Sequence, residues 1–168
     1  RASDGRMTAL TSRAMQQAGH ITQPVFAPLM DDMFFDQGSD IAVSRFIAPR
    51  VEVGLAFILG KPLQGPGATL FDVLSATDYV TPAIEIIDSR IEQFDRETRV
   101  MRKVQDTISD FAANAGIVLG GRPVRPDAVD LRRVGGMLHN NAVIRETGMP
   151  AGRLKHQATG PTSLTKQP

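Results

Sequence analysis

Apolar and polar residues alternate most regularly over residues 51–59, which predicts a β-strand there. One face of this strand would carry Val51, Val53, Leu55, Phe57 and Leu59, and the other would carry Glu52, Gly54, Ala56 and Ile58. A second strand is predicted over residues 79–87, where Glu85 stands inside an apolar string. Each of the two strands therefore has a carboxylate among apolar neighbours.

The rest of the chain is patterned as short elements separated by turns. Thr69 followed by Asp72 is a capping-box pattern, which predicts a short helix to about Ala76. Other predicted elements are, in chain order, a helix from Thr11 or Ser12 to Ala18, a turn at 36–40, a loop at 61–67, a charged loop or helix at 88–102, a helix at 106–114, a strand at 117–119 and a hairpin at 137–145 that turns at Asn140-Asn141. Residues 1–28 have only weak periodicity. Short strands and helices interleaved without a regular βαβ repeat predict an α+β fold with a mixed or antiparallel sheet.

Composition bounds the class of protein. Of 168 residues, 42% are apolar and 22% charged, which excludes a disordered tail, a collagen-like fibre and a coiled coil. A net charge of +1 gives no electrostatic reason to expect nucleic acid or an anionic membrane as partner. The chain has no cysteine, no apolar run near the ~18 residues that span a bilayer and no signal-peptide segment at its first residues. We therefore expect a cytoplasmic protein in which residues 1–168 form one domain.

Glu52 and Glu85 are the main candidates for chemistry, because a buried carboxylate is unfavourable unless it is paired, hydrogen-bonded or bound to a metal. Two carboxylates on separate strands could converge on one hard cation, Mg²⁺ or Mn²⁺. The alternative is that each faces solvent or pairs with a nearby arginine such as Arg50 or Arg90. The pattern alone leaves both interpretations open.

Asp31 and Asp32 form a second candidate, as catalytic groups, since acidic residues inside an apolar run line a pocket or cap nearby backbone N–H groups. The other motifs are typical of ordinary structure. Residues 65–67 resemble a turn more than a phosphate loop. The three histidines share no metal-ligand spacing, and four arginines form a basic cluster that we expect to be solvated: His20, His139 and His156, and Arg122, Arg125, Arg132 and Arg133.

Several strings of the chain resemble one family. They are LMDDMFF at 29–35, PRVEVGLAF at 49–57, ATDYV at 76–80, PAIEIIDSR at 82–90, ISD at 108–110 and AANAGIVLGGRP at 112–123. Together they are similar to the bacterial 2-hydroxypentadienoate hydratase and 4-oxalocrotonate decarboxylase family, within the fumarylacetoacetate hydrolase superfamily. The resemblance runs from about residue 10 to residue 152, and residues 153–168 diverge from it.

The resemblance implies a mixed β-roll with short flanking helices, of which this chain holds only part. It implies a homo-oligomeric hydro-lyase that adds water to a 2-oxo dicarboxylate of the 2-oxo-hept-4-ene-1,7-dioate type in aromatic (homoprotocatechuate) catabolism. It also implies Mg²⁺ or Mn²⁺ held by a Glu-x-Glu pair on one strand and a third carboxylate on a later strand. Glu52 matches the first ligand and Glu85 the third.

The chain departs from the family pattern at three site positions. The second metal-binding glutamate falls on Gly54, an expected lysine falls on Met7, and an expected aspartate falls on Val25. Two alternatives to a working hydratase therefore stay open. One is a non-catalytic homologue that acts as a structural or assembly partner, and the other is the decarboxylase branch of the same family.

Overall fold

A mixed four-stranded sheet forms the centre of the protein. The computed structural model describes residues 3–9, 16–17, 21–65 and 67–148, with the side chains of 3 and 4 left out. The strands are β1 (Ser3–Ala9), β2 (Val25–Met30), β3 (Phe34–Phe35), β4 (Arg50–Leu59), β5 (Thr77–Ile87), β6 (Asn114–Leu119), β7 (Gly136–Asn140) and β8 (Val143–Gly148). The helices are α2 (Leu70–Ala76) and α3 (Val104–Ser109), with the 3₁₀ turns η1 (Asp31–Met33), η2 (Val43–Arg45) and η3 (Phe111–Ala113). None of the described helices is long and apolar enough to cross a membrane.

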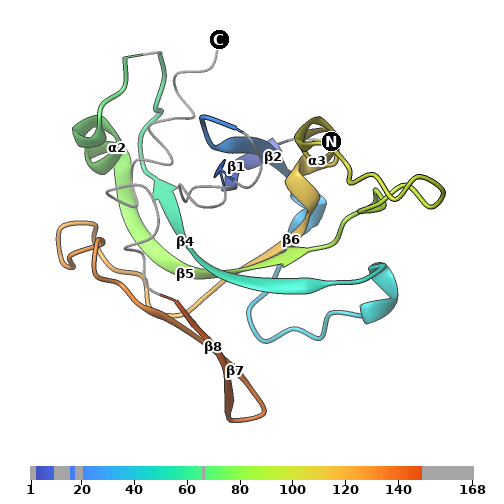
Figure 1. Cartoon of the computed structure of the whole chain (residues 1–168). Helices are drawn as coiled ribbons and strands as arrows, with labels where there is room; N and C mark the ends of the chain where they lie inside the picture. The colour runs from blue at the N-terminus through green and yellow to red at the C-terminus, as the bar shows by residue number, and fades with distance from the viewer. Residues whose placement is uncertain (1–2, 10–15, 18–20, 66, 149–168) are drawn as a thin grey trace.

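The central sheet has the strand order β3-β6-β5-β4 (Figure 1). Its β4–β5 and β5–β6 pairs are antiparallel, whereas β3 and β6 run parallel. Two further antiparallel pairs stand beside it, β1 with β2 and β7 with β8. This sheet-dominated α+β architecture with few helices is the class that the sequence pattern predicts.

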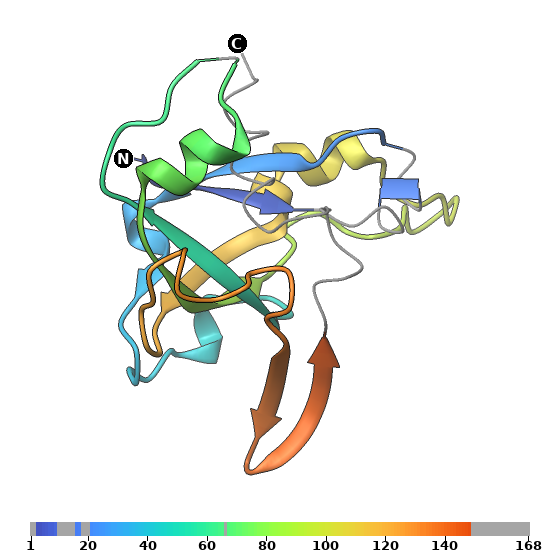
Figure 2. The same cartoon turned by 90° about the vertical axis from the view of Figure 1, so that its left-hand side faces the viewer.

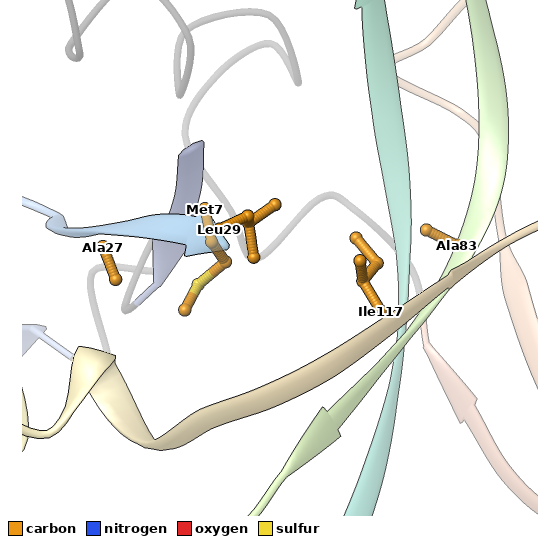
Figure 3. Packing of buried hydrophobic residues seen from close by; sticks show 5 residues of the cluster. All are labelled: Met7, Ala27, Leu29, Ala83 and Ile117. Atoms are coloured by element: carbon orange, nitrogen blue, oxygen red, sulfur yellow. The ribbon is translucent and has the colours of Figure 1, made fainter. Parts of the chain in front are cut away.

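The β1–β2 pair covers one face of the central sheet. Met7 from β1 and Leu29 from β2 pack with Ala83 of β5 and Ile117 of β6 in one buried cluster (Figure 3). Burial of such apolar side chains is the main stabilising term of a core, roughly 25 cal/mol for each Å² removed from water. The face of the sheet that carries Ala83 therefore points toward β1 and β2.

The β7–β8 hairpin extends away from the rest of the molecule in both views (Figures 1 and 2). All six residues of β8 are exposed. The hairpin touches the body at its base, where the Cα of Gly136 lies so close to β4 that an added Cβ would be 3.3 Å from Cγ1 of Val53. The predicted hairpin is confirmed, but its turn lies one residue later than predicted, at Asn141 and Ala142 with positive φ angles of 50° and 63°, because Asn140 still pairs with Val143.

Two predicted helices need comment. The capping box of α2 is confirmed, because the Thr69 side chain accepts from the backbone of Asp72 and the Asp72 side chain accepts from the backbone of Thr69. The helix predicted over 106–114 is wrong in its second half. Its helical part is α3, and the backbone enters the left-handed region at Phe111, Ala112 and Ala113 with φ between 50° and 65°. That conformation ends a helix, and β6 starts directly afterwards.

The amino-terminal stretch is also more ordered than its weak periodicity indicates. Residues of β1 and β2 form an antiparallel pair in which Met7 opposes Ala27. Polar residues interrupt the pattern of β1, so its pairing partner and not its own alternation identifies it as a strand. Of the helix predicted between Thr11 or Ser12 and Ala18, only Gln16 and Gln17 lie within the described residues, and both are helical. The divergent stretch 153–168, with His156, lies outside the described residues.

Candidate functional site

The two candidate metal ligands meet in the central sheet. In the antiparallel β4–β5 ladder, Glu52 stands directly opposite Glu85, and Gly54 stands opposite Ala83. Directly opposed residues of such a pair have Cβ atoms about 5 Å apart and project to the same face. The register therefore brings both carboxylates to one place, on the face that Ala83 turns toward β1 and β2.

The two glutamates differ in their surroundings. Glu52 lies on β4, the strand at one edge of the sheet, and it is exposed. Glu85 lies on β5, between β4 and β6, and it is half-buried. Its Oε1 accepts a hydrogen bond of 2.9 Å from Nδ2 of Asn114, the first residue of β6. The site is thus open to solvent on the β4 side and enclosed by protein on the β6 side.

Arg90, an ion-pair partner that the sequence suggested for the glutamates, pairs with Asp110 instead. The Arg90 guanidinium is used by Asp110, whose Oδ1 receives Nε, and by the carbonyl oxygen of Asn114, which receives Nη1 at 2.9 Å. The Asp110 side chain is buried. Arg90 therefore fixes the backbone before β6, and it reaches Glu85 only indirectly, through Asn114.

The second expected ligand position offers no carboxylate, since Gly54 has no side chain. No other atom lies within 4 Å of an ideal Cβ built on this glycine, so the space beside Glu52 is open. Among the described residues there is no group of three or more His, Cys, Asp or Glu side chains that could hold a metal ion. Two carboxylates suit Mg²⁺, which is commonly bound by one or two of them and completes its octahedron with water or ligand oxygens.

The two other positions of departure from the family pattern lie in the core. Met7 is 7% exposed and Val25 is 5% exposed. Met7 belongs to the same cluster as Ala83, the register partner of Gly54. The wall of the site toward β1 is therefore apolar, and Met7 brings no ionisable group to it.

Asp31 and Asp32 lie on the exposed turn η1, which follows β2 and contacts β6. Asp31 Oδ1 accepts a hydrogen bond of 3.1 Å from the backbone N–H of Asp32. This is a side-chain-to-backbone contact between neighbouring residues, and the N-cap residue of the turn, Met30, has no side-chain cap. Neither residue joins Glu52 and Glu85 in a metal-binding group of the described residues.

A cavity of about 280 Å³ opens at the β4 edge, between the sheet and the base of the β7–β8 hairpin. Its walls include Glu52 and Gly54 of β4, Pro82 of β5 and Thr147 of β8. Val53, which contacts the hairpin at Gly136, also lines this cavity. Because side chains alternate along a strand, the Glu52 side chain projects from the opposite face of β4, toward β1 and β2, so the cavity lies behind the carboxylate pair and not in front of it.

Three of the four arginines of the basic cluster, Arg125, Arg132 and Arg133, form ion pairs with nearby aspartates. Asp130 receives Nε and Nη2 of Arg132 at 2.8 and 2.9 Å, and Arg133 lies 3.6 Å away. Hydrogen bonding by the Arg132 side chain, aided by its backbone N–H, lowers the pKa of Asp130 from 3.8 to about 2. Arg125 forms a separate ion pair with Asp127, with 3.2 Å between Nε and Oδ1. These exposed pairs match the predicted solvated surface.

Asn114 is the site residue that the sequence reasoning missed. It is fully buried at 0% exposure and touches Glu85 directly. The available signal was the one used for the glutamates, a lone polar residue among apolar and small ones, here in the string AANAGIVLGG at 112–121.

Comparison with known proteins finds that the chain is similar to named dienoate hydratases and, in fold, to a decarboxylase. No protein-family model matches the chain. The chain is nevertheless homologous to several named hydratases, which confirms the resemblance inferred from its motifs.

Two of the similar proteins are named hydratases. The chain is 57% identical to 2-oxo-hept-4-ene-1,7-dioate hydratase of Escherichia coli over 156 residues, which cover 93% of this chain and 58% of that protein. It is 39% identical to 2-hydroxypent-2,4-dienoate hydratase of Pseudomonas putida over 151 residues, covering 89% of this chain and 65% of that protein. The chain thus spans less than two thirds of the length of these relatives.

A solved structure matches almost the whole chain. 4-Oxalocrotonate decarboxylase from Pseudomonas putida G7, complexed with magnesium and adipate, superposes with a TM-score of 0.89 and 30% sequence identity. The match covers 98% of this chain and 60% of that one. The same decarboxylase complexed with calcium and acetate gives a TM-score of 0.87.

Proposed function

We propose that this chain carries the metal-binding part of a hydratase that adds water to a 2-hydroxy-dienoic dicarboxylate of the 2-oxo-hept-4-ene-1,7-dioate type. The observation that carries the proposal is the direct opposition of Glu52 and Glu85 in the β4–β5 ladder. The name of the 57% identical relative supports the substrate class. The fold assigned with this proposal is the mixed β-roll of the fumarylacetoacetate hydrolase type, here as one domain.

Glu52 and Glu85 are the residues that would hold Mg²⁺ or Mn²⁺. When bound, such an ion supplies Lewis-acid polarisation of the oxo and carboxylate oxygens of a 2-oxo acid. The magnesium and calcium in the decarboxylase structures, together with adipate and acetate, support this choice of cation and of carboxylate ligand. The other groups of the site belong to the chain itself.

The chain's own contributions are binding and proton handling. The apolar wall that includes Met7 excludes water on the β1 side, while the exposed Glu52 and the open space beside Gly54 admit the substrate at the β4 edge. With no ionisable side chain at Met7 or Val25, proton transfer in this proposal falls to Asp31 and Asp32 on η1. Because Asp31 and Asp32 are exposed, a proton passes between them and the site only if the bound substrate or a water molecule contacts them.

The test follows loss of absorbance of 2-hydroxyhepta-2,4-dienedioate with and without Mg²⁺. We expect Mg²⁺-dependent loss in the parent chain, a further rise in Gly54→Glu and abolition in Glu85→Gln. Asp127→Asn, an exposed carboxylate of the basic cluster, is the matched control. Equal rates with and without Mg²⁺ in both the parent and Gly54→Glu would overturn the proposal.

A non-catalytic homologue is the second candidate, and the substitution of three expected site residues by Met7, Val25 and Gly54 favours it. In that case the parent is inert and assembles with itself or with an active subunit. Activity that appears only in Gly54→Glu, together with an oligomer in native mass spectrometry, would select this candidate. Release of CO₂ from 4-oxalocrotonate would instead select the decarboxylase branch.

Cytoplasmic location and homo-oligomerisation complete the proposal. Fractionation of the source cell tests the first. Mass measurement of the native protein tests the second, and a single species at the mass of one chain would contradict it.

A further inference from the structure

Asn114 is a fully buried polar residue beside Glu85. It is the only described side chain that is both polar and fully buried, at 0% exposure. Its Nδ2 donates to Glu85 Oε1 at 2.9 Å, while its Oδ1 is buried and has no hydrogen-bond partner among the described residues. Buried polar atoms are nearly always paired, so an exception calls for an explanation.

Among the described residues, the Asn114 side chain is hydrogen-bonded at its donor end only. A buried amide is stabilised most when both its N–H and its oxygen are paired, since an unpaired buried acceptor loses the hydrogen bonds it made to water. Within the described residues, the bond to Glu85 is the only hydrogen bond of this side chain. The burial of the amide therefore has one structural result, a donor held against one oxygen of Glu85.

The donor is held rigidly. The carbonyl oxygen of Asn114 accepts from Nη1 of Arg90 at 2.9 Å, and Arg90 is itself bound to the buried Asp110. One residue earlier, the carbonyl oxygen of Ala113 accepts from the backbone N–H of Asp88 at 2.8 Å. Both sides of the Asn114 backbone are thus anchored, so its side chain approaches Glu85 from a fixed direction.

Glu85 needs such a restraint because Glu52 faces it. Like charges directly opposite each other in a sheet repel, and an unrestrained glutamate would turn away. We propose that Asn114 is a positioning residue that holds one oxygen of Glu85 on the β6 side, so that the other remains directed to a cation shared with Glu52. This inference rests on the proposed function, because it assigns a role to a residue behind a ligand of the same site.

Groups that orient metal ligands from behind commonly change metal affinity by 10- to 100-fold when removed. The test measures Mn²⁺ binding to the full chain by the electron paramagnetic resonance signal of free Mn²⁺. Asn114→Leu keeps the approximate volume and removes the donor. We expect its Mn²⁺ dissociation constant to rise by about 10-fold.

Thr81→Val is the matched control. Thr81 is also buried on β5, and its hydroxyl donates to the carbonyl oxygen of Gly120, not to a glutamate. We expect this variant to lose stability while its Mn²⁺ affinity stays within twofold of the parent. An Asn114→Leu affinity within twofold of a Mn²⁺-binding parent overturns the proposal, as does an equal loss in Thr81→Val.

A second measurement covers the case in which Asn114→Leu does not fold. NMR follows the side-chain amide signals of Asn114. They should broaden in the parent at substoichiometric Mn²⁺, and their positions in Glu85→Gln should differ from those in the parent. The signals of the exposed Asn140 should show neither effect. Bound Mn²⁺ without this broadening overturns the inference and leaves the proposed function intact. No Mn²⁺ binding in either the parent or Gly54→Glu overturns both, even if the amide still responds to Glu85→Gln.

Discussion

Glu52 and Glu85 face each other across the β4–β5 ladder, each with an apolar residue on both sides in its own strand. Like charges directly opposite in a sheet destabilise it. Exposure of Glu52 and the hydrogen bond from Asn114 to Glu85 reduce this repulsion without removing it. The pair therefore opposes folding, as expected of residues retained for binding.

Removing one charge should stabilise the metal-free protein. In Glu52→Gln the repulsion is lost and the shape kept, so we expect the free energy of unfolding to rise by about 0.5 kcal/mol. Urea denaturation in the presence of EDTA measures this change in the free energy of unfolding. Glu146→Gln, on the exposed strand β8 opposite Leu138, is the control and should stay near zero. A destabilised Glu52→Gln would mean that Glu52 has a stabilising role instead.

A carboxylate introduced at position 54 should lower the melting temperature without metal and raise it with Mg²⁺. Gly54→Glu adds a third negative charge to open space, so we expect a lower melting temperature without metal. Saturating Mg²⁺ should raise it above that of the parent in Mg²⁺, because a ligand present at 100 times its Kd adds about 2.7 kcal/mol of stability. Calorimetric titration of Mg²⁺ gives the affinity itself.

The control for this substitution is Gly67→Glu, since Gly67 also has no atom within 4 Å of an added Cβ and lies in the loop before α2. It should add the charge without changing the Mg²⁺ response. Equal Mg²⁺ affinities in the parent and Gly54→Glu would contradict the assignment of position 54 to the site.

Asp88 should be a major determinant of stability and not of binding. The residue is 4% exposed, and its two oxygens accept from the backbone N–H groups of Ile47 and Ala48 at 2.8 and 2.7 Å. Asp88→Ala leaves both donors unpaired, and hydrogen bonds to a charged group contribute about 1.5–3 kcal/mol each. We expect a loss of about 3 kcal/mol in urea denaturation. Asp40→Ala, at an exposed position, should change stability by less than about 0.5 kcal/mol.

The pKa of Asp130 provides a pH test. Because Arg132 lowers it from 3.8 to about 2, the carboxylate contributes stability at every pH above its unfolded value near 3.8. That contribution is lost progressively as the pH falls from about 4 through about 2. Carbon NMR titration of the side chain should give the lowered value, and Arg132→Gln should return it toward 3.8. An unchanged pKa in Arg132→Gln, or the same rise in Arg125→Gln, would contradict Arg132 as the cause of the shift.

The sequence by itself determined the elements whose information is local. The alternation at residues 51–59, the apolar run at 79–87 and the Thr69–Asp72 capping box correspond to β4, β5 and α2. Each follows from side-chain period or from a hydrogen bond within one turn. The motif resemblance likewise indicates the family and the two glutamates from the order of residues alone.

Only the tertiary structure decided what these elements do together. β1 becomes a strand because β2 pairs with it, and the chain leaves α3 through left-handed residues because Asp110 binds Arg90 and β6 must begin at Asn114. Glu52 and Glu85 face each other because of the register of the β4–β5 pair, which joins residues that are 33 positions apart in the chain. The role of Asn114 depends on β6 lying beside β5, and local sequence carries no record of such long-range pairing.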